Sequence, residues 1–233
     1  MFTYPITGAS VSAAKTGLLH WWDLTEASGT RADSHGSLDF TDSGAGGTRT
    51  GPGGVGVAAN FDGSPDRFYT ANPSGLTLTD LTSISICGWF IFDVSFIPHY
   101  PIHNGTDYNT AAQLNYSIQR SSTTINWRLG ATPTGLESVS PGTVANATWV
   151  FIYAYYNGVT KDFGASLNDG TVTSATSVNT RTDVSSNLYT FFAQPSYYGN
   201  GGSASIGIYD QQLDAATVTS LYNGGTRLLY ADL

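Results

Sequence analysis

Few residues in this 233-residue chain are of types that carry acid–base or nucleophilic chemistry. Of its seventeen acidic residues only two are glutamates, Glu26 and Glu137, and they stand far apart in the sequence. A glycosidase needs two carboxyl groups flanking the scissile bond, yet no acid lies two positions from either glutamate. The G-x-S-x-G pattern of serine hydrolases and the H-E-x-x-H pattern of zinc enzymes are also absent. We therefore expect no catalytic residues, although aspartates alone could still supply a glycosidase pair.

Four histidines and one cysteine complete the set of reactive side chains. His99 and His103 have a separation that suits one face of a helix, but Pro98 and Pro101 disfavour a helix there. We expect both to be solvated loop histidines rather than metal ligands. Cys87 lies in the apolar run ICGWFIFDVSFI and has no second cysteine to pair with, so we expect a small buried side chain and not a nucleophile.

Tyrosines in Gly- and Pro-rich loops are the residues best suited to binding. A ligand site pairs apolar surface with a few fixed polar groups, so exposed aromatic rings beside amides predict a carbohydrate site. The PSYYGNGG segment is the strongest candidate, because its two tyrosines have no core strand to fill, and the loop 93–110 is the second. The candidate residues are Tyr197, Tyr198, Asn200, Tyr100 and Tyr108. An oligomer interface would explain the same tyrosines equally well.

The composition excludes several classes of function. Charged residues make up 11% of the chain and the net charge is −8, whereas an average soluble protein is about 25% charged. Phosphate contacts need clustered Lys and Arg, so nucleic acid is not an expected partner. The longest apolar run is interrupted by Gly88, Asp93 and Ser95 and is too short for a membrane span. The start, MFTYPITGAS, has neither the basic residues nor the apolar core of a secretory signal.

Hydrophobic periodicity predicts an all-β protein of one domain. Apolar and polar residues alternate along 111–120, as in a strand with one wet face. The segment 149–156 is apolar on both faces, and the Asn-Gly and Asp-Gly steps after it predict a meander of two hairpins. Most of the five tryptophans fall on such strands and are expected in the core. The Gly-rich stretch 43–59 is expected to be a long surface loop leading into a strand at 58–61.

One helix is predicted near the C-terminus. Asp214 is a suitable N-cap, and Leu213 with Val218 forms a hydrophobic staple around it. Asn223-Gly224-Gly225 then supplies a left-handed stop. The helix spans about two turns, so it needs tertiary packing to form.

Five segments follow one another through nearly the whole chain. They are GLLHWWDLTEASGTRADSHGSLDFTDSG (17–44), NFDGSPDRFY (60–69), SISICGWFIF (83–92), ATWVFIYAYYNG with ASLNDG (147–170) and IGIYDQQLDAATVTSLYNGG (206–225). In this order they resemble laminin-G-like domains of the concanavalin A-like lectin/glucanase superfamily. The resemblance implies a two-sheet antiparallel jelly-roll sandwich with its terminal strands side by side and one short C-terminal helix. Enzymes of this superfamily typically carry Glu-x-Asp-x-Glu along one strand, which is missing here.

The resemblance also suggests where calcium would bind. Laminin-G-like domains often hold Ca²⁺ near an Asp-Ser-x-Gly loop, with oxygen ligands as a hard cation requires. The matching loop begins at Asp33, with Asp39 and Asp42 as further candidate ligands. The acidic pair that the family places before its final Ile-Tyr is replaced here by Ala204 and Ser205. We therefore favour Asx-type turn residues and no cofactor, with calcium as the alternative.

The resemblance favours a non-catalytic lectin-like structural module. The opening segment also resembles versions found in bacteriophage virion proteins, and the chain starts without a signal sequence. We therefore expect a capsid decoration or fibre protein, made in the host cytoplasm and displayed on the virion. Its expected partners are other virion proteins, further copies of itself and, with weak affinity, a cell-surface glycan. Residues 1–16 would form an anchoring arm or oligomer contact, and 17–233 the sandwich domain. The alternatives are a free-standing carbohydrate-binding lectin and, less favoured, a divergent glycoside hydrolase.

Overall fold

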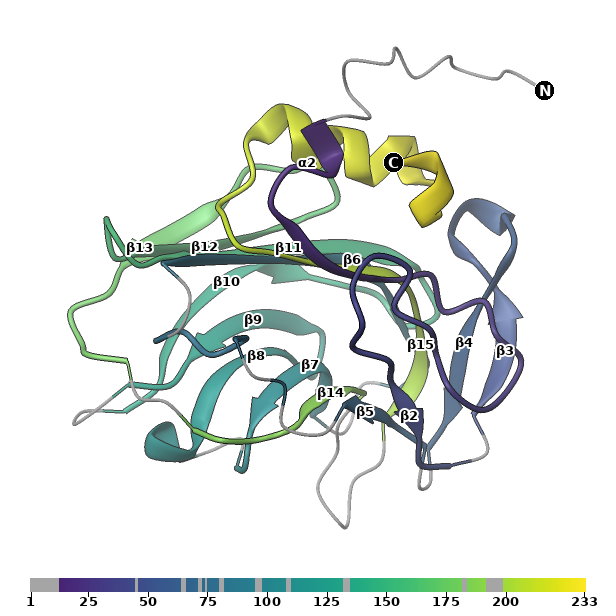
Figure 1. Ribbon diagram of the computed structural model, residues 1–233, viewed down its shortest axis with the longest axis horizontal. Coiled ribbons are helices and arrows are strands. Elements are labelled where there is room, and N and C mark those ends of the chain that lie inside the picture. The colour runs from purple at the N-terminus through teal and green to yellow at the C-terminus, as the bar shows by residue number, and fades with distance from the viewer. Residues whose placement is uncertain are drawn as a thin grey trace.

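The computed structural model is a sandwich of two antiparallel β-sheets, with a short helical layer over one of them (Figure 1). It describes residues 13–44, 46–63, 66–70, 73, 75–79, 82–94, 98–107, 110–131, 135–181, 184–191 and 199–233. In Figure 1 one sheet is seen edge-on as a nearly flat layer, and several strands of the other sheet are bowed. The predicted all-β class, the two antiparallel sheets and the short C-terminal helix are confirmed.

The two sheets have eight and seven strands. The eight-stranded sheet runs, in spatial order, β13 (Thr173–Thr176), β12 (Asp162–Leu167), β11 (Val150–Asn157), β6 (Ser83–Phe92), β15 (Asn200–Tyr209), β4 (Val57–Asp62) and β3 (Gly47–Thr50), with β1 (Leu18–Trp22) also paired to β15. The seven-stranded sheet runs β10 (Glu137–Thr143), β9 (Thr124–Leu129), β8 (Leu114–Ser121), β7 (His99–Gly105), β14 (Leu188–Thr190), β5 (Phe68–Thr70) and β2 (Thr41–Asp42). The helical turns are η1 (Pro52–Gly54), η2 (Ala111–Gln113), η3 (Asn223–Gly225) and η4 (Tyr230–Asp232). An α-helix, α2 (Ala215–Tyr222), lies near the C-terminus.

The strands nearest the two chain ends lie side by side, as the resemblance implies. The first strand, β1, pairs antiparallel with the last, β15, and Trp21 lies opposite Gly207. A Cβ at Gly207 would come within 2.7 Å of the Trp21 ring, so only glycine lets the indole lie across β15. This pairing joins the two ends of the domain in the middle of the eight-stranded sheet.

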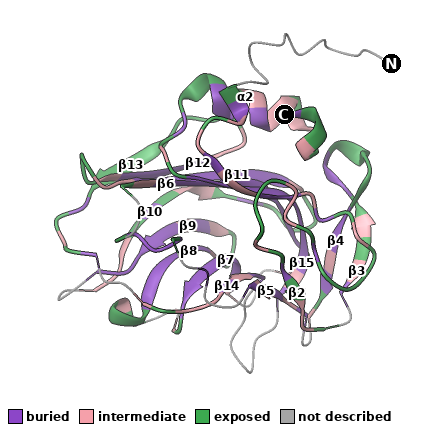
Figure 2. Ribbon diagram, in the orientation of Figure 1, coloured by how far each residue is buried: buried purple, intermediate pink, exposed green. Residues whose placement is uncertain are grey.

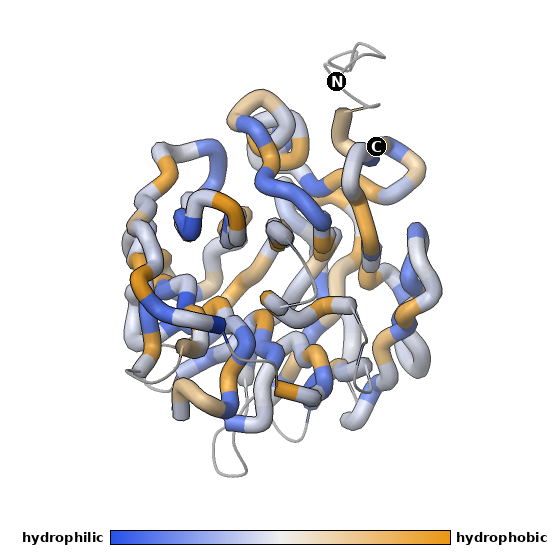
Figure 3. Tube along the Cα trace, turned by 60° about the vertical axis from the view of Figure 1, so that its left-hand side comes forward, coloured by the Kyte–Doolittle hydropathy of each residue, from blue (hydrophilic) through white to orange (hydrophobic). Residues whose placement is uncertain are grey.

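Alternation of side chains along the strands builds a core between the sheets. Trp22, Trp127, Tyr116 and Ile152 are all fully buried there. Figure 2 shows the buried strands facing one another, and Figure 3 shows hydrophobic and hydrophilic positions alternating along the trace. Period-two patterning therefore accounts for the packing of both sheets.

A second apolar cluster covers the outer face of the eight-stranded sheet. It joins Trp89 and Tyr153 of the sheet to Val218 and Leu221 of α2. Asp214 caps this helix by accepting a 2.7 Å hydrogen bond from the Thr217 N–H, and Asn223 ends it in the left-handed conformation. The predicted N-cap and stop are confirmed, and the cluster supplies the packing that so short a helix needs. In the part of the chain that the structure describes, no helix has the length and apolarity needed to cross a membrane.

The expectation for His99 and His103 is wrong. Both lie in β7 with 0% exposure and are not solvated loop residues. Pro98 and Pro101 do exclude a helix, but β7 accommodates Pro101 because the β7–β8 register shifts between His99 and Ile102. At such an irregularity the missing N–H of a proline removes no ladder hydrogen bond.

Two loop expectations also need correction. The Gly-rich stretch 43–59 contains a strand, β3, which forms a hairpin with β4. Between them Gly53, Gly54 and Gly56 have positive φ, which reverses the chain where other residues would be strained. The β11–β12 hairpin is confirmed, but its left-handed residue is Lys161 and the Asn157 side chain accepts from the N–H groups that follow it. The turn is therefore longer than the two-residue form expected.

Candidate functional site

One residue from each strand of the seven-stranded sheet falls on a single transverse row. In order across the sheet the row consists of Thr41, Tyr69, Tyr189, His103, Ser117, Arg128 and Ser138, each in register with the next. Their neighbours along the strands, among them Phe68, Leu188 and Trp127, belong to the core. Because alternate residues face opposite sides of a sheet, this outer row lies on the face away from the core.

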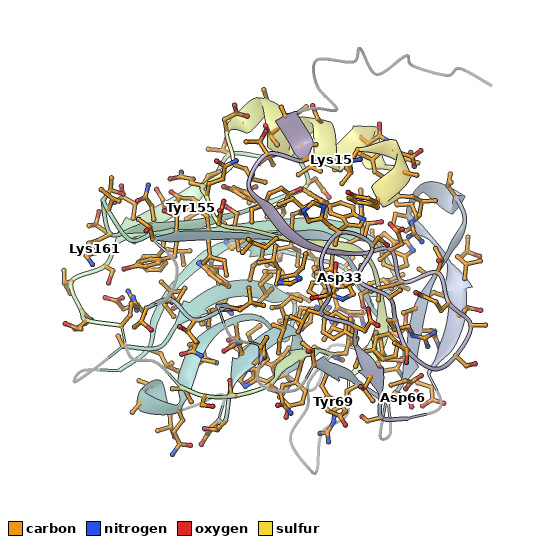
Figure 4. The ribbon with its side chains drawn as sticks, viewed as in Figure 1. Lys15, Asp33, Asp66, Tyr69, Tyr155 and Lys161 are labelled. Carbon is orange, nitrogen blue, oxygen red and sulfur yellow. The ribbon has the colours of Figure 1, made fainter. Side chains whose placement is uncertain are left out.

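The first half of the outer row is aromatic. The Tyr69 and Tyr189 ring centroids are 6.1 Å apart, and those of Tyr189 and His103 are 6.2 Å apart. Both tyrosines are half-buried, and the Arg67 guanidinium lies 5.6 Å from the centre of the Tyr189 ring. Tyr69 is labelled in Figure 4 on the side of the sandwich opposite the helical layer. Two ordered rings therefore offer partly open apolar surface on one face.

The second half of the outer row is polar and incompletely bonded. Ser117 is 0% exposed and Arg128 is 8% exposed. The Ser117 Oγ and the Arg128 Nη1 have no hydrogen-bond partner among the described residues. A buried polar group without a partner costs about 1–3 kcal/mol, so such groups are normally satisfied by ordered water or by a ligand. Ser117 and Arg128 are in register on neighbouring strands, so one ligand could engage both residues.

The charge of the outer row is positive and comes from arginine. Burial lowers the pKa of His103 to about 4, against a smaller opposing effect of its hydrogen bond to the Gly105 carbonyl. His103 is therefore neutral near pH 7. Arg128 and the neighbouring Arg67 remain as cations, and none of the seven residues of the row is acidic. The arrangement suits neutral or acidic ligands in a protein whose net charge is −8.

The structure places two of the five predicted sugar-binding residues. Tyr100 lies beside the outer row, in a T-shaped ring contact with His103, but it is only 2% exposed. Its hydroxyl accepts a 2.8 Å hydrogen bond from Gln119, so it supports the row and presents no open ring. Asn200 begins β15, is half-buried and donates to the Asp62 carbonyl at 3.4 Å. Tyr108, Tyr197 and Tyr198 lie outside the described residues and stay predictions.

The carboxylate of Asp33 organises the loop in which the family resemblance suggests a calcium site. Its Oδ1 accepts from the N–H groups of Trp21, His35 and Gly36, and its Oδ2 accepts from the His20 Nδ1 and the Leu38 N–H. The side chain is fully buried. Burial alone would raise the pKa of this carboxyl, but the hydrogen bond from His20 and those from the backbone lower it well below its usual value. Asp33 is thus a permanent anion holding a turn together.

This donor set does not fit calcium. Ca²⁺ takes 6–8 oxygen ligands, whereas both Asp33 oxygens already accept N–H donors. Asp39 accepts from the Asp33 N–H, and Asp42 is shared between the Arg31 guanidinium and the Gly44 N–H. Within the described ranges no three His, Cys, Asp or Glu side chains form a group able to hold a metal. At the position of the family's acidic pair, Ser205 instead donates to the Leu228 carbonyl.

Both glutamates are used for structure. Glu137 pairs with Arg181 and also accepts from Ser177 and Asn179. Burial would raise the pKa of Glu137, but these hydrogen bonds and the charge of Arg181 lower it overall, which is opposite to what a glycosidase acid requires. Glu26 accepts from the Ala32 N–H. Cys87 is buried as predicted, and burial raises the pKa of its thiol to about 12.

The aromatic half of the outer row was not predicted from the sequence. Tyr69 and Tyr189 sit on strands of three residues each, too short to show a clear alternation. The polar residues of 111–120 do indicate a face turned away from the core, and that face contributes Ser117 to the polar half of the outer row. Ser117 on that face is completely buried, however, so the expectation of a wet face is wrong there.

No protein-family model matches the chain, and no curated protein matches it by sequence. Solved structures do share its fold. A structure of botulinum neurotoxin type C, which depends on interaction with two ganglioside molecules to enter cells, matches 91% of this chain and 52% of its own, with TM-score 0.70 and 13% identity. The binding domain of botulinum neurotoxin DC in complex with rat synaptotagmin II matches 90% and 52%, with TM-score 0.69 and 14% identity.

The likeness extends to another toxin. The binding domain of Paraclostridial Mosquitocidal Protein 1 matches 91% of this chain and 53% of its own, with TM-score 0.71 and 12% identity. The chain thus spans about half the length of each of these structures. At such identities the likeness establishes a shared β-sandwich fold, of the kind found in receptor-binding domains of toxins.

Proposed function

We propose that the protein is a non-catalytic, lectin-like module that binds a carbohydrate chain along the outer row. The observation that carries this proposal is the joining, on one sheet face, of the half-open rings of Tyr69 and Tyr189 with the unsatisfied polar atoms of Ser117 and Arg128. A sugar presents both an apolar ring face and hydroxyl groups, and a site for it needs both kinds of surface.

The length of the outer row favours an oligosaccharide over a single sugar. Neighbouring strands lie about 4.8 Å apart, so the four steps from Tyr69 on β5 to Arg128 on β9 cover about 19 Å. Arginine is the side chain best suited to a planar carboxylate, and Arg128 has one donor without a partner in the described structure. We therefore favour neutral or carboxylate-bearing glycans. The fold shared with toxin binding domains, one of them from a toxin that needs gangliosides to enter cells, supports this class of ligand.

The first test is a glycan array followed by titration of the strongest oligosaccharide against matched tyrosine variants. Aromatic anchors at interfaces commonly contribute more than 1 kcal/mol, so Tyr189→Ala should weaken binding by about tenfold. Tyr230→Ala is the control, because this partly exposed ring lies in η4, on the helical side of the sandwich. Equal binding by wild type and Tyr189→Ala would contradict the proposal. Tyr197→Ala and Tyr198→Ala in the same assay test the loop tyrosines.

We further propose that the module is displayed on a bacteriophage virion as a decoration or fibre protein, in homo-oligomeric form. The support is the resemblance of 17–44 to segments of virion proteins. Mass spectrometry of purified particles should detect the chain in fixed stoichiometry with the capsid or tail proteins. A map of the particle should then show residues 1–16 in contact with a neighbour. Particles that lack the chain, or in which those residues contact nothing, would overturn this assignment.

A further inference from the structure

A cavity lies on the sheet opposite the outer row, between α2 and the outer faces of β11 and β12. It has a volume of about 350 Å³ and is lined by Tyr153, Tyr155, Ser166, Asp169, Ser174 and Gln212, among others. Figure 4 shows Tyr155 near this face, far from Tyr69 on the other sheet. We call this space the helix cavity. Its size lies at the lower end of the range for small-molecule sites.

A glycine and two tyrosines shape the floor of the helix cavity. A Cβ at Gly164 would come within 2.8 Å of the Tyr155 ring, so glycine at this position lets the ring lie close to β12. The Tyr153 and Tyr155 rings are stacked with centroids 5.9 Å apart. The Tyr153 hydroxyl donates to the Leu213 carbonyl and so fixes the segment that enters α2. Tyr153 is 1% exposed and Tyr155 5% exposed, so the two tyrosines form a fixed wall of the cavity and present little open ring surface.

One buried polar atom in the helix cavity has no partner. Ser166 is 0% exposed, and its Oγ makes no hydrogen bond to any described residue. Ser166 lies opposite Tyr153 in register, and its neighbour Ala165 belongs to the core between the sheets. Its hydroxyl therefore faces the cavity, where a ligand could satisfy it.

The charge of the residues that line the helix cavity limits which ligands it can bind. The cavity contains two carboxylates, Asp169 and Asp214, and no Lys, Arg or His among its lining residues. Asp214 is occupied in capping α2. Asp169 is exposed at the rim and makes no ion pair in the described part of the chain. A carboxylate that can accept from two hydroxyl groups favours a polyol and disfavours an anion.

We propose that the helix cavity binds one uncharged pyranose residue. Asp169 and Gln212 would bond hydroxyls at the rim, Ser166 would bond one at the base, and the buried tyrosines would shape the wall of the cavity. The inference goes beyond the proposed function, because this site lies on the other sheet and has the opposite charge to the outer row. It would make the protein a two-site module for chemically different sugars.

Saturation-transfer NMR with glucose, galactose, mannose and N-acetylglucosamine as probes, and glucuronate as the anionic comparison, tests this site. A single sugar forms few contacts, so we expect millimolar affinity for at least one neutral sugar. Ser174→Trp should abolish that signal by filling the cavity from the exposed edge strand β13. Ala175→Trp is the matched control, because it adds the same side chain to the next residue, which does not line the cavity. Ser166→Ala should weaken binding roughly three- to tenfold by removing one hydrogen bond.

The result can overturn the inference in three ways. No transfer to any neutral sugar, transfer that survives Ser174→Trp, or equal transfer to glucuronate would each exclude it. Tyr189→Ala separates the two sites: loss of monosaccharide binding in that variant would assign the signal to the outer row. Conversely, failure of the oligosaccharide test at the outer row leaves the helix-cavity result unchanged.

Discussion

At the scale of single residues, Asp33 is the side chain on which the most local structure depends. Replacement by Asn should leave N–H donors facing an amide NH₂ and remove the charge. We expect Asp33→Asn to lower the free energy of unfolding by about 1.5–3 kcal/mol at pH 7, the range for hydrogen bonds to charged groups. Urea denaturation measures this loss. Asp169→Asn is the control, since that carboxylate is exposed and has no ion-pair partner in the described structure.

The same substitution predicts a dependence on pH. The folded state lowers the pKa of Asp33 below the ordinary value of 3.8. Its stabilising effect is therefore fully present above about pH 4 and is lost as the pH falls below that value, where the unfolded chain takes up the proton first. The difference between wild type and Asp33→Asn should shrink as the pH falls from about 4 to about 2. A difference that grows with acidity would show that the carboxylate is not ionised in the fold.

The calcium alternative also belongs to the residue scale. Because the oxygens of Asp33 already accept N–H donors, added Ca²⁺ should leave the melting temperature unchanged, and EDTA should do the same. Differential scanning fluorimetry of the purified protein in millimolar CaCl₂ and in EDTA checks this. A rise in melting temperature that Asp39→Asn or Asp42→Asn abolishes would restore the calcium site that the family resemblance implies.

At the scale of elements, sequence signals predicted those helices and strands whose formation depends on residues close together in the chain. The cap at Asp214 and the stop at Asn223 predicted α2, and the apolar run of 149–156 predicted β11, because each signal acts within a few residues. For β7 local reasoning failed. Its prolines do exclude a helix, but the bulge that admits Pro101 depends on pairing with β8. The register of partner strands is not encoded in the segment itself.

The capping of α2 yields a prediction for this element. Loss of an N-cap side chain costs about 1 kcal/mol, so Asp214→Ala should destabilise the protein by that amount in urea denaturation. Asp214→Asn should retain most of the stability, because an amide oxygen can still accept from the Thr217 N–H. If both variants were equally destabilised, the carboxylate charge rather than the cap would be the source of the effect.

At the scale of the molecule, neither candidate site could be assembled from the sequence. The outer row brings together seven single residues, between Thr41 and Tyr189 in the sequence. Their order follows the strands of the sheet rather than the chain. The helix cavity joins a meander to a helix that lies about forty residues further along. The composition and family resemblance predicted the two layers, but which side chains share a face depends on strand order and register, and no single segment determines those.

The whole fold should be sensitive to mild acid because it buries two neutral histidines. Burial lowers the pKa of both His99 and His103 to about 4, from an ordinary value of 6.5. Below pH 6.5 the two histidines therefore bind protons in the unfolded chain but stay neutral in the folded chain. The free energy of unfolding is highest above pH 6.5 and falls as the pH drops toward 4. At pH 5 the loss is about 2 kcal/mol for each histidine.

His103→Gln should flatten the decline in the urea midpoint between pH 7.5 and pH 5, whereas His35→Gln, at an exposed position, should follow wild type. A wild-type midpoint that stays constant across this range would mean that the two rings are not held neutral by burial.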